Sequence, residues 1–185
     1  MKRILFLIVA TAAIIAQSSC QNKAKAEPAP FVAEQTEVDQ TSAKVRTIAA
    51  DLKGQQIFEA IKANYPDQVV LIDLWATWCP PCRAAMKEID LIKKDLMERG
   101  VVFVYLTGET SPLKNWQEMI PPIDGEHYRL PKAQWQNLCE SMNIPGIPAY
   151  IIFNKDGSVA YSNLTEGGYP GNDVIQNNLE VALSK

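Results

Sequence analysis

Two short, almost wholly apolar runs stand out in the pattern of hydrophobic and polar positions along the chain. They are residues 69–75 (VVLIDLW) and 101–106 (VVFVYL), and such runs are typical of strands covered on both faces. Between them, apolar side chains recur at steps of three and four residues up to Gly100, which predicts a long amphipathic helix. Because a strand–helix–strand unit is right-handed, we expect the two strands to be parallel.

The remaining pattern predicts elements that complete an α/β fold. Apolar positions at helical spacing predict a helix over 55–64. Residues 107–130 are less regular, although Ser111 and Pro112 are suited to cap and begin a short helix that ends near position 120. Downstream, the pattern predicts a helix over 131–142, a hairpin of strands over 147–153 and 158–162, and a final helix that is capped by Asn172 or Asp173. We therefore expect a central mixed sheet with helices on both faces.

The N-terminal residues are predicted to be a secretory signal. Two basic residues precede an apolar stretch over 4–16, which is too short for a membrane-spanning helix. Small residues then precede Cys20, as in the lipobox of bacterial lipoproteins, although Gln17 stands where an apolar residue is usual. We predict a signal peptide over 1–19 and lipid attachment at Cys20, with ordinary cleavage near residues 24–26 as the alternative.

The composition separates a tether from a folded domain. Residues 20–45 are rich in Ala, Glu, Gln, Lys and Thr, which predicts a flexible tether, and a single domain is expected over 46–185. The net charge is −3 and no run of like charge exceeds two residues, so nothing indicates nucleic-acid binding. Export would place the cysteines in an oxidising compartment.

Two cysteines follow the first predicted strand, in the segment Trp-Cys-Pro-Pro-Cys at 78–82. Residues three apart on a helix share a face, which brings the sulfurs of Cys79 and Cys82 within reach of a disulfide. A helix N-terminus also favours the thiolate of Cys79. A C-x-x-C between a strand and a helix is typical of a thioredoxin-like redox site, whereas a purely structural disulfide is the alternative. A zinc site is disfavoured, because the chain has one histidine and no second C-x-x-C.

Three motifs in order resemble the thioredoxin superfamily, and specifically its exported TlpA/ResA-like thiol–disulfide oxidoreductases. They are D-L-W-A-T-W-C-P-P-C at 73–82, G-I-P at 146–148 and N-K-D-G at 154–157. The resemblance covers about residues 46–185, and the segment after the second strand resembles the insertion of this branch. Two positions depart from the pattern: Lys87 replaces the usual kinking proline, and Asp73 stands where many exported members have Asn.

The resemblance implies roles for the residues around the cysteines. Cys79 would be a partly exposed nucleophile that forms a mixed disulfide with the substrate, and Cys82 would resolve it. Asp73 would be buried, with its pKa raised by desolvation, and would relay a proton to or from Cys82. The alternative for Asp73 is a strand-end carboxylate that meets solvent or a backbone amide.

Substrate contacts are implied on both sides of the cysteines. Pro148 would form a cis peptide bond and aim the backbone of Ile147 at the substrate for strand-like pairing. Trp78 would be an apolar platform beside the cysteines. Pro80 and Pro81 have no N–H to donate, so we expect only moderate stabilisation of the Cys79 thiolate, which favours a reductant over a strong oxidant.

The sequence thus predicts an envelope thiol–disulfide oxidoreductase that reduces protein disulfides without a bound cofactor. By the same resemblance, a membrane thiol reductase would supply its electrons. The alternatives are a disulfide oxidase or isomerase, and a metal-carrying or scaffolding module. His127 is expected to be a structural loop residue, with substrate docking as the alternative. Cys139 is expected to be a buried, inert thiol, with a regulatory disulfide as the alternative.

Overall fold

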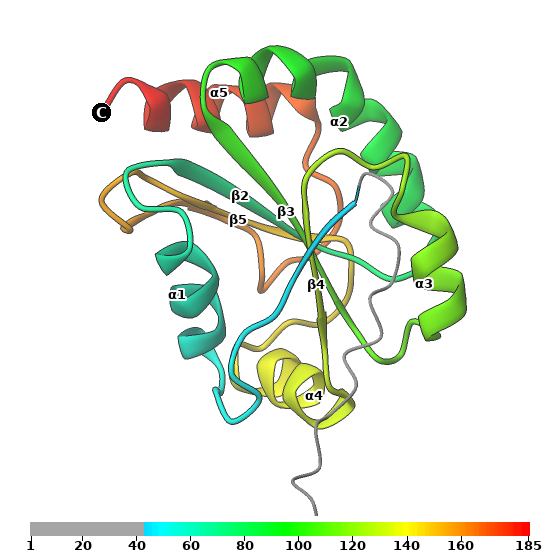
Figure 1. Cartoon of the computed structure of the whole chain (residues 1–185). Coiled ribbons are helices and arrows are strands. Elements are labelled where there is room, and N and C mark those ends of the chain that lie inside the picture. Colours follow the sequence, from blue (N-terminus) through cyan, green and yellow to red (C-terminus); the bar gives the residue numbers. More distant parts are fainter. Residues whose placement is uncertain (1–42) are drawn as a thin grey trace, which may run out of the picture. The chain divides into compact units, whose positions relative to one another are not determined.

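The computed structural model describes residues 43–185, which form a six-stranded sheet covered by helices on both faces (Figure 1). The strands are β1 (Lys44–Arg46), β2 (Val69–Leu74), β3 (Val101–Gly108), β4 (Glu126–Leu130), β5 (Ala149–Phe153) and β6 (Val159–Ser162). The helices are α1 (Gln55–Ala63), α2 (Pro80–Glu98), α3 (Leu113–Met119), α4 (Lys132–Ser141) and α5 (Asn172–Leu183). The predicted signal peptide, Cys20 and most of the predicted tether lie outside the described residues.

The strand order is β1-β4-β3-β2-β5-β6, which places β2 and its cysteine loop in the middle of the sheet. Strand β2 pairs in parallel with β3, and β3 and β1 pair in parallel with β4. On its other side β2 pairs antiparallel with β5, which forms the hairpin with β6. The predicted mixed sheet and parallel β2–β3 pair are therefore confirmed.

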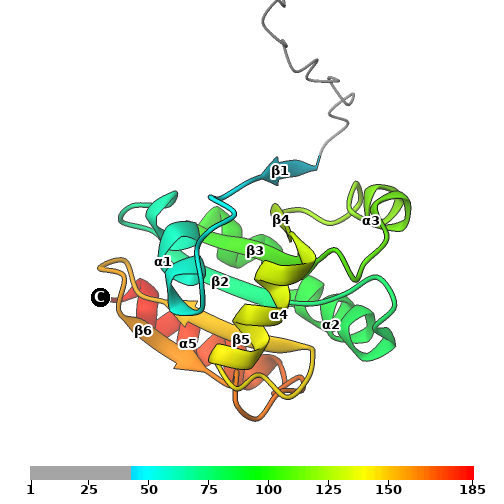
Figure 2. The ribbon, with the colours of Figure 1, turned by 90° about the horizontal axis from the view of Figure 1, so that it is seen from below.

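Alternate side chains of the central strands enter two separate hydrophobic cores, because successive residues of a strand point to opposite faces. Val69 and Leu71 of β2 pack with α2, α3 and α5. Val70, Ile72 and Leu74 pack with α1 and α4 on the other face. Figures 1 and 2 show these two layers of helices on either side of the sheet. Asp73 has the parity of Leu71, so its side chain lies on the α2 face.

Strand β4 was not predicted, because its five residues are mostly polar. It forms where its side chains meet partners distant in sequence. The buried carboxylate of Glu126 accepts a hydrogen bond from Arg46 of β1 at 2.8 Å and lies 3.6 Å from Lys44. The ring of His127 stacks on Tyr105 of β3, with centroids 5.3 Å apart. His127 is thus a fully buried strand residue and not the expected loop histidine.

Two predicted helix caps are wrong. Helix α3 begins at Leu113 after Pro112, and the side chain of Ser111 bonds elsewhere in the fold. Helix α5 is preceded by Gly171, whose φ of 96° suits a residue without a Cβ. The side chain of Asn172 instead donates to the carbonyl oxygen of Glu88 on α2, at 2.7 Å, and so ties α5 to α2.

The other elements agree with the prediction within a few residues. Helix α2 runs unbroken from Pro80 to Glu98, with Lys87 in its interior, and Gly100 follows with a φ of 95°. Strand β1 begins at Lys44, two residues before the expected start of the domain at 46. Among residues 43–185, no helix is long and apolar enough to span a membrane.

Candidate active site

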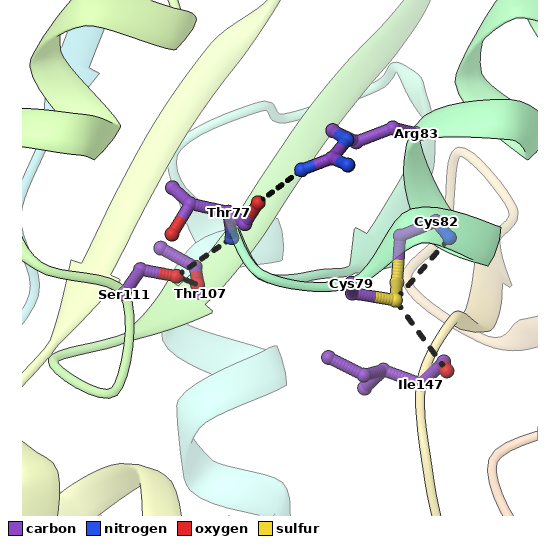
Figure 3. The surroundings of a disulfide bond; sticks show 7 residues. All are labelled: Thr77, Cys79, Cys82, Arg83, Thr107, Ser111 and Ile147. Carbon is purple, nitrogen blue, oxygen red and sulfur yellow. Dashed lines mark hydrogen bonds between the residues drawn. A yellow bond between two sulfur atoms is a disulfide. The ribbon is translucent and has the colours of Figure 1, made fainter.

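Cys79 and Cys82 form a disulfide at the start of α2, with their Cα atoms 5.3 Å apart (Figure 3). Strand β2 ends at Leu74, and a short loop leads to Cys79, which precedes the first turn of the helix. The backbone N–H of Cys82 points at the Sγ atom of Cys79 at 3.2 Å. Pro80 and Pro81 fill the first two helical positions without an N–H, as their sequence positions predict. Among the hydrogen bonds of the described residues, that of Cys82 is the one backbone donor to this sulfur.

Both cysteines are largely covered. Cys79 is 3% exposed and Cys82 is fully buried, so the expectation that Cys79 is partly exposed is wrong. The cover comes from a loop 68 residues further along the chain, where the carbonyl oxygen of Ile147 lies 3.7 Å from the Sγ of Cys79. Figure 3 shows Ile147 directly beside the sulfur. Trp78, next to Cys79, is by contrast 58% exposed.

The Ile147–Pro148 peptide bond is cis, as predicted. Pro148 is buried and Ile147 is half-buried at the start of β5. The carbonyl oxygen of Pro148 accepts a hydrogen bond from the N–H of Gly168 at 2.7 Å. The loop that faces the disulfide is therefore held by the segment that follows β6.

A second turn holds the residues before Cys79. The N–H of Thr77 donates to the Oγ of Ser111 at 3.0 Å, and this hydroxyl also lies 2.9 Å from the Oγ1 of Thr107 (Figure 3). The indole N–H of Trp78 donates to the carbonyl oxygen of Thr110 at 3.1 Å. Ser111 and Thr107 are fully buried. Sequence reasoning missed both, because a serine before a proline indicates a helix cap more directly than a contact with a distant loop.

Asp73 is fully buried at the middle of the sheet, as predicted. Neither carboxylate oxygen has a hydrogen-bond partner among the described residues, so the alternative of a solvated or amide-bound carboxylate does not apply. Burial raises the pKa of Asp73 well above its usual value, and the positive charge of Lys93 opposes this. Asp73 shares the α2 face of the sheet with buried Cys82.

Titratable side chains from neighbouring strands form a row with Asp73 across the sheet. Tyr105 of β3 and Tyr150 of β5 are its direct neighbours in register, and His127 of β4 is the neighbour of Tyr105. The ammonium group of Lys93 on α2 donates to the hydroxyl of Tyr105 at 3.1 Å. Burial lowers the pKa of His127 and raises that of Tyr105, because each loses solvation of its charged form.

Cys139 lies apart from this site on α4. It is a free thiol that is half-buried and not buried as expected, although burial raises its pKa, which favours an inert thiol. Trp75, Trp116 and Trp135 are buried in the two cores. Within residues 43–185, no three or more His, Cys, Asp or Glu side chains gather as metal ligands.

Comparison with known proteins gives sequence relatives that match part of the chain. The chain is 23% identical to the thiol-disulfide oxidoreductase ResA of Bacillus thuringiensis over 114 residues, which are 60% of this chain and 62% of that protein. The match thus spans less than two thirds of the relative's length. A thioredoxin of Rickettsia bellii is 47% identical over 38 residues, 20% of this chain and 33% of the relative.

Solved structures share the fold. The thioredoxin domain of a thiol-disulfide oxidoreductase from Bacteroides vulgatus has a TM-score of 0.55 at 19% identity, covering 65% of this chain and 83% of its own. A secreted thiol-disulfide isomerase from Corynebacterium glutamicum has a TM-score of 0.53 at 18% identity, covering 67% and 75%. The sequence profile of the redoxin family matches residues 40–174, most of the chain. With its thioredoxin-like fold, the chain belongs to the redoxin family.

Proposed function

We propose that this protein is a thiol–disulfide oxidoreductase that reduces disulfides of exported proteins through Cys79 and Cys82. The observation that carries the proposal is the Cys79–Cys82 disulfide at the start of α2, with the cis-proline loop against its outer sulfur. A structural disulfide would staple two distant segments, whereas this one joins residues three apart. The ResA relatives are thiol-disulfide oxidoreductases, which supports the same chemistry.

The reaction begins with the reduced pair. The thiolate of Cys79 attacks one sulfur of the substrate disulfide, that bond breaks, and a mixed disulfide forms while the departing sulfur takes a proton from solvent. Cys82 then loses its proton and attacks the Sγ of Cys79. The mixed disulfide breaks, the second substrate thiol is protonated, and the Cys79–Cys82 disulfide forms. Two electrons have passed from the protein to its substrate.

Asp73 is proposed to accept the proton of Cys82 and pass it on. Its carboxylate lies on the same face of the sheet as Cys82 and has no competing hydrogen bond among the described side chains. Because burial raises its pKa, the group exchanges a proton closer to the pH range in which thiols titrate than an exposed Asp does. Uptake of this proton neutralises a carboxylate that solvent cannot stabilise, and burial therefore favours the acceptance step.

The proposed substrate surface surrounds the outer sulfur. Trp78, Pro80 and Pro81 are exposed next to Cys79 and offer an apolar rim. On the other side, the backbone of Ile147 beside cis Pro148 is available for strand-like pairing with a polypeptide. The surface suits an extended protein segment rather than a small ligand in a closed cavity.

The direction of exchange is proposed to be reduction. A single backbone N–H, that of Cys82, donates to the Sγ of Cys79, and the adjacent prolines provide none. A weakly stabilised thiolate makes the reduced state less favourable, and the pair then gives up electrons readily. Equilibration with glutathione buffers tests this: we expect a potential below about −220 mV, whereas a value near −120 mV, typical of a strong oxidase, would contradict it.

The oxidised pair needs an external donor of two electrons. We propose that a membrane thiol reductase supplies them on the envelope side, where a lipid on Cys20 would keep the domain near the membrane. The predicted signal peptide supports this location. Metabolic labelling with a radioactive fatty acid tests the anchor, and Cys20→Ala is expected to abolish the label.

Two alternative functions, a disulfide oxidase or isomerase and a metal carrier, can be tested on this protein. A disulfide oxidase or isomerase would show the high potential described above. A metal carrier would use Cys79 and Cys82 as thiolate ligands, but the nearby described residues add no cluster of further ligands. Stoichiometric binding of Cu(I) by the reduced protein, without turnover of disulfides, would favour the carrier.

Trapping of the mixed disulfide tests the proposed function directly. The Cys82→Ser protein should accumulate a covalent complex with insulin, because the second attack is lost. The Cys79→Ser protein is the matched control and should trap nothing under the same conditions. If Cys79→Ser traps insulin as well as Cys82→Ser does, the assignment of Cys79 as the nucleophile is wrong.

A further inference from the structure

The cis-proline loop beside the disulfide is held from outside by one buried asparagine. Asn163 directly follows β6 and is 7% exposed. Its backbone N–H donates to the carbonyl oxygen of Tyr150 at 3.1 Å, and its side-chain Oδ1 accepts from the N–H of Tyr150 at 2.8 Å. Tyr150 is the second residue of β5, two positions after Pro148. Asn163 thus pairs with both backbone groups at the start of β5.

In this pairing the side-chain Oδ1 of Asn163, and not its main-chain carbonyl oxygen, accepts the hydrogen bond from Tyr150. That carbonyl oxygen accepts instead from the N–H groups of Glu166 and Gly167, at 3.2 and 2.8 Å, and so closes a turn. The side-chain Nδ2 donates to the carbonyl oxygen of Gly168 at 2.8 Å. The chain can therefore leave the sheet at Asn163 while the last bond of the β5 ladder is kept.

This turn contacts the cis-proline loop. The N–H of Gly168 donates to the carbonyl oxygen of Pro148 at 2.7 Å. Gly167 has a φ of 67°, and a Cβ added there would lie 3.2 Å from the carbonyl oxygen of Gly146. Positive φ and close approach both demand glycine at this position. The turn thus binds Pro148 and lies close to Gly146, the residues on either side of Ile147, whose carbonyl oxygen lies 3.7 Å from the Sγ of Cys79.

We propose that Asn163 is a positioning residue that sets the cis-proline loop for pairing with a polypeptide substrate. The inference rests on the proposed function, because it concerns how the substrate of that reaction is held. Asn163 touches neither sulfur in any described contact and acts through Tyr150, Gly168 and Pro148. Its loss should therefore weaken exchange with a polypeptide disulfide and spare exchange with a small one, which needs the sulfur but not the strand-like edge.

The test compares two substrates on the full chain. Reduction of insulin measures exchange with a polypeptide, and reduction of 5,5′-dithiobis(2-nitrobenzoate) measures exchange with a small disulfide. For Asn163→Ala we expect kcat/KM with insulin to fall at least about tenfold, mainly through KM, because a misplaced binding edge costs rate steeply. With the small disulfide we expect a change below about twofold, because the thiolate of Cys79 is unaltered.

The matched control is Asn154→Ala. Asn154 is also a buried asparagine of the β5–β6 hairpin, at its opposite end, where its Nδ2 donates to the Oγ of Ser158 at 2.9 Å. Its loss should lower thermal stability without changing the ratio of the two rates. If Asn154→Ala shifts the ratio as Asn163→Ala does, or if Asn163→Ala slows both substrates equally, the positioning role is wrong.

A second pair of variants covers the case in which Asn163→Ala does not fold. Gly167→Ala should displace the loop at Gly146 and lower insulin reduction selectively. Gly157→Ala is its control, because Gly157 also has a positive φ, of 86°, but an added Cβ there meets nothing within 4 Å. Equal ratios for these two variants would overturn the inference. The wild-type protein separates the two hypotheses, since its failure to reduce either substrate would contradict the proposed function itself.

Discussion

Replacing Asp73 with asparagine should stabilise the oxidised protein increasingly as pH rises. The unfolded chain has an ordinary Asp pKa of about 3.9, and burial raises the folded value well above it. Between these two values the folded protein holds a proton that the unfolded chain has released. Raising the pH therefore favours unfolding through this group. Its stabilising contribution is complete below about pH 4 and is lost as the pH rises through the folded pKa.

The magnitude follows from one proton. In that pH range, wild-type stability should fall relative to Asp73→Asn by up to about 1.4 kcal/mol for each pH unit. Other groups cancel in this comparison. His127 has no electrostatic coupling to Asp73 among the causes of its own shift, and Tyr105 and Tyr150 titrate above the range. Near pH 4 the two proteins should differ little, because a neutral carboxyl and an amide are then compared in the same unpartnered position.

Urea unfolding of both oxidised proteins at each pH unit from 4 to 8 measures the difference in free energy. Lys93→Met provides a second arm, because loss of the ammonium charge that opposes the shift should raise the pKa of Asp73 further and extend the slope to higher pH. A difference between wild type and Asp73→Asn that stays constant from pH 4 to 8 would refute the reasoning. Asp73 would then titrate as a solvated carboxylate, and the proposed proton relay would lose its base.

Three further predictions concern residues around the site. Ser111→Ala should lower the free energy of unfolding by about 1–3 kcal/mol, because the N–H of Thr77 loses its acceptor. Thr107→Val keeps that acceptor and should lower it by less than about 1.5 kcal/mol. Denaturant titration of both variants measures the two losses. The stability of His127→Phe should depend less on pH than that of wild type below about pH 6.5. The lowered pKa of buried His127 makes the unfolded wild-type chain bind more protons than the folded one there, so wild-type stability decreases as the pH falls. Unfolding at pH 5, 6 and 7 measures this slope, and an equal slope in the two proteins would contradict the prediction. Pro81→Ala adds an N–H beside Cys79 and should shift the reduction potential by about 10–30 mV toward a stronger oxidant in a glutathione equilibrium, while a shift in the other direction would contradict it.

The central β2–α2–β3 unit could be predicted because local pattern and tertiary role agree there. Both strands are buried along nearly their whole length, so a continuous apolar run appears in the sequence. The single interruption, Asp73, was identified as a site residue through the resemblance to thioredoxin-like proteins, which implies a buried carboxylate at this position. The hairpin of β5 and β6 was predictable from the turn at 154–157, which is local chemistry.

Strand β4 and the burial of Cys79 were not predictable, because their partners are far away in the chain. Glu126 is buried, and its carboxylate accepts a hydrogen bond from Arg46, which lies 80 residues earlier. Cys79 is covered by a loop that follows it by 68 residues. No window of sequence around either residue contains this information. The wrongly predicted cap at Ser111 has the same cause, since its hydroxyl accepts from a backbone N–H 34 residues before it.

Two distant contacts hold the segments beside the disulfide by their backbone. Ser111 binds the N–H of Thr77 on one side of the disulfide, and the turn after Asn163 binds the carbonyl of Pro148 on the other. The two cysteines supply reactivity, but their exposure and orientation depend on these flanking turns. The C-x-x-C motif therefore indicates where exchange occurs, whereas under our proposal the choice of polypeptide depends on turns outside the motif. Substitutions in the turns should change which substrate is reduced, and substitutions of Pro80 or Pro81 should change the reduction potential.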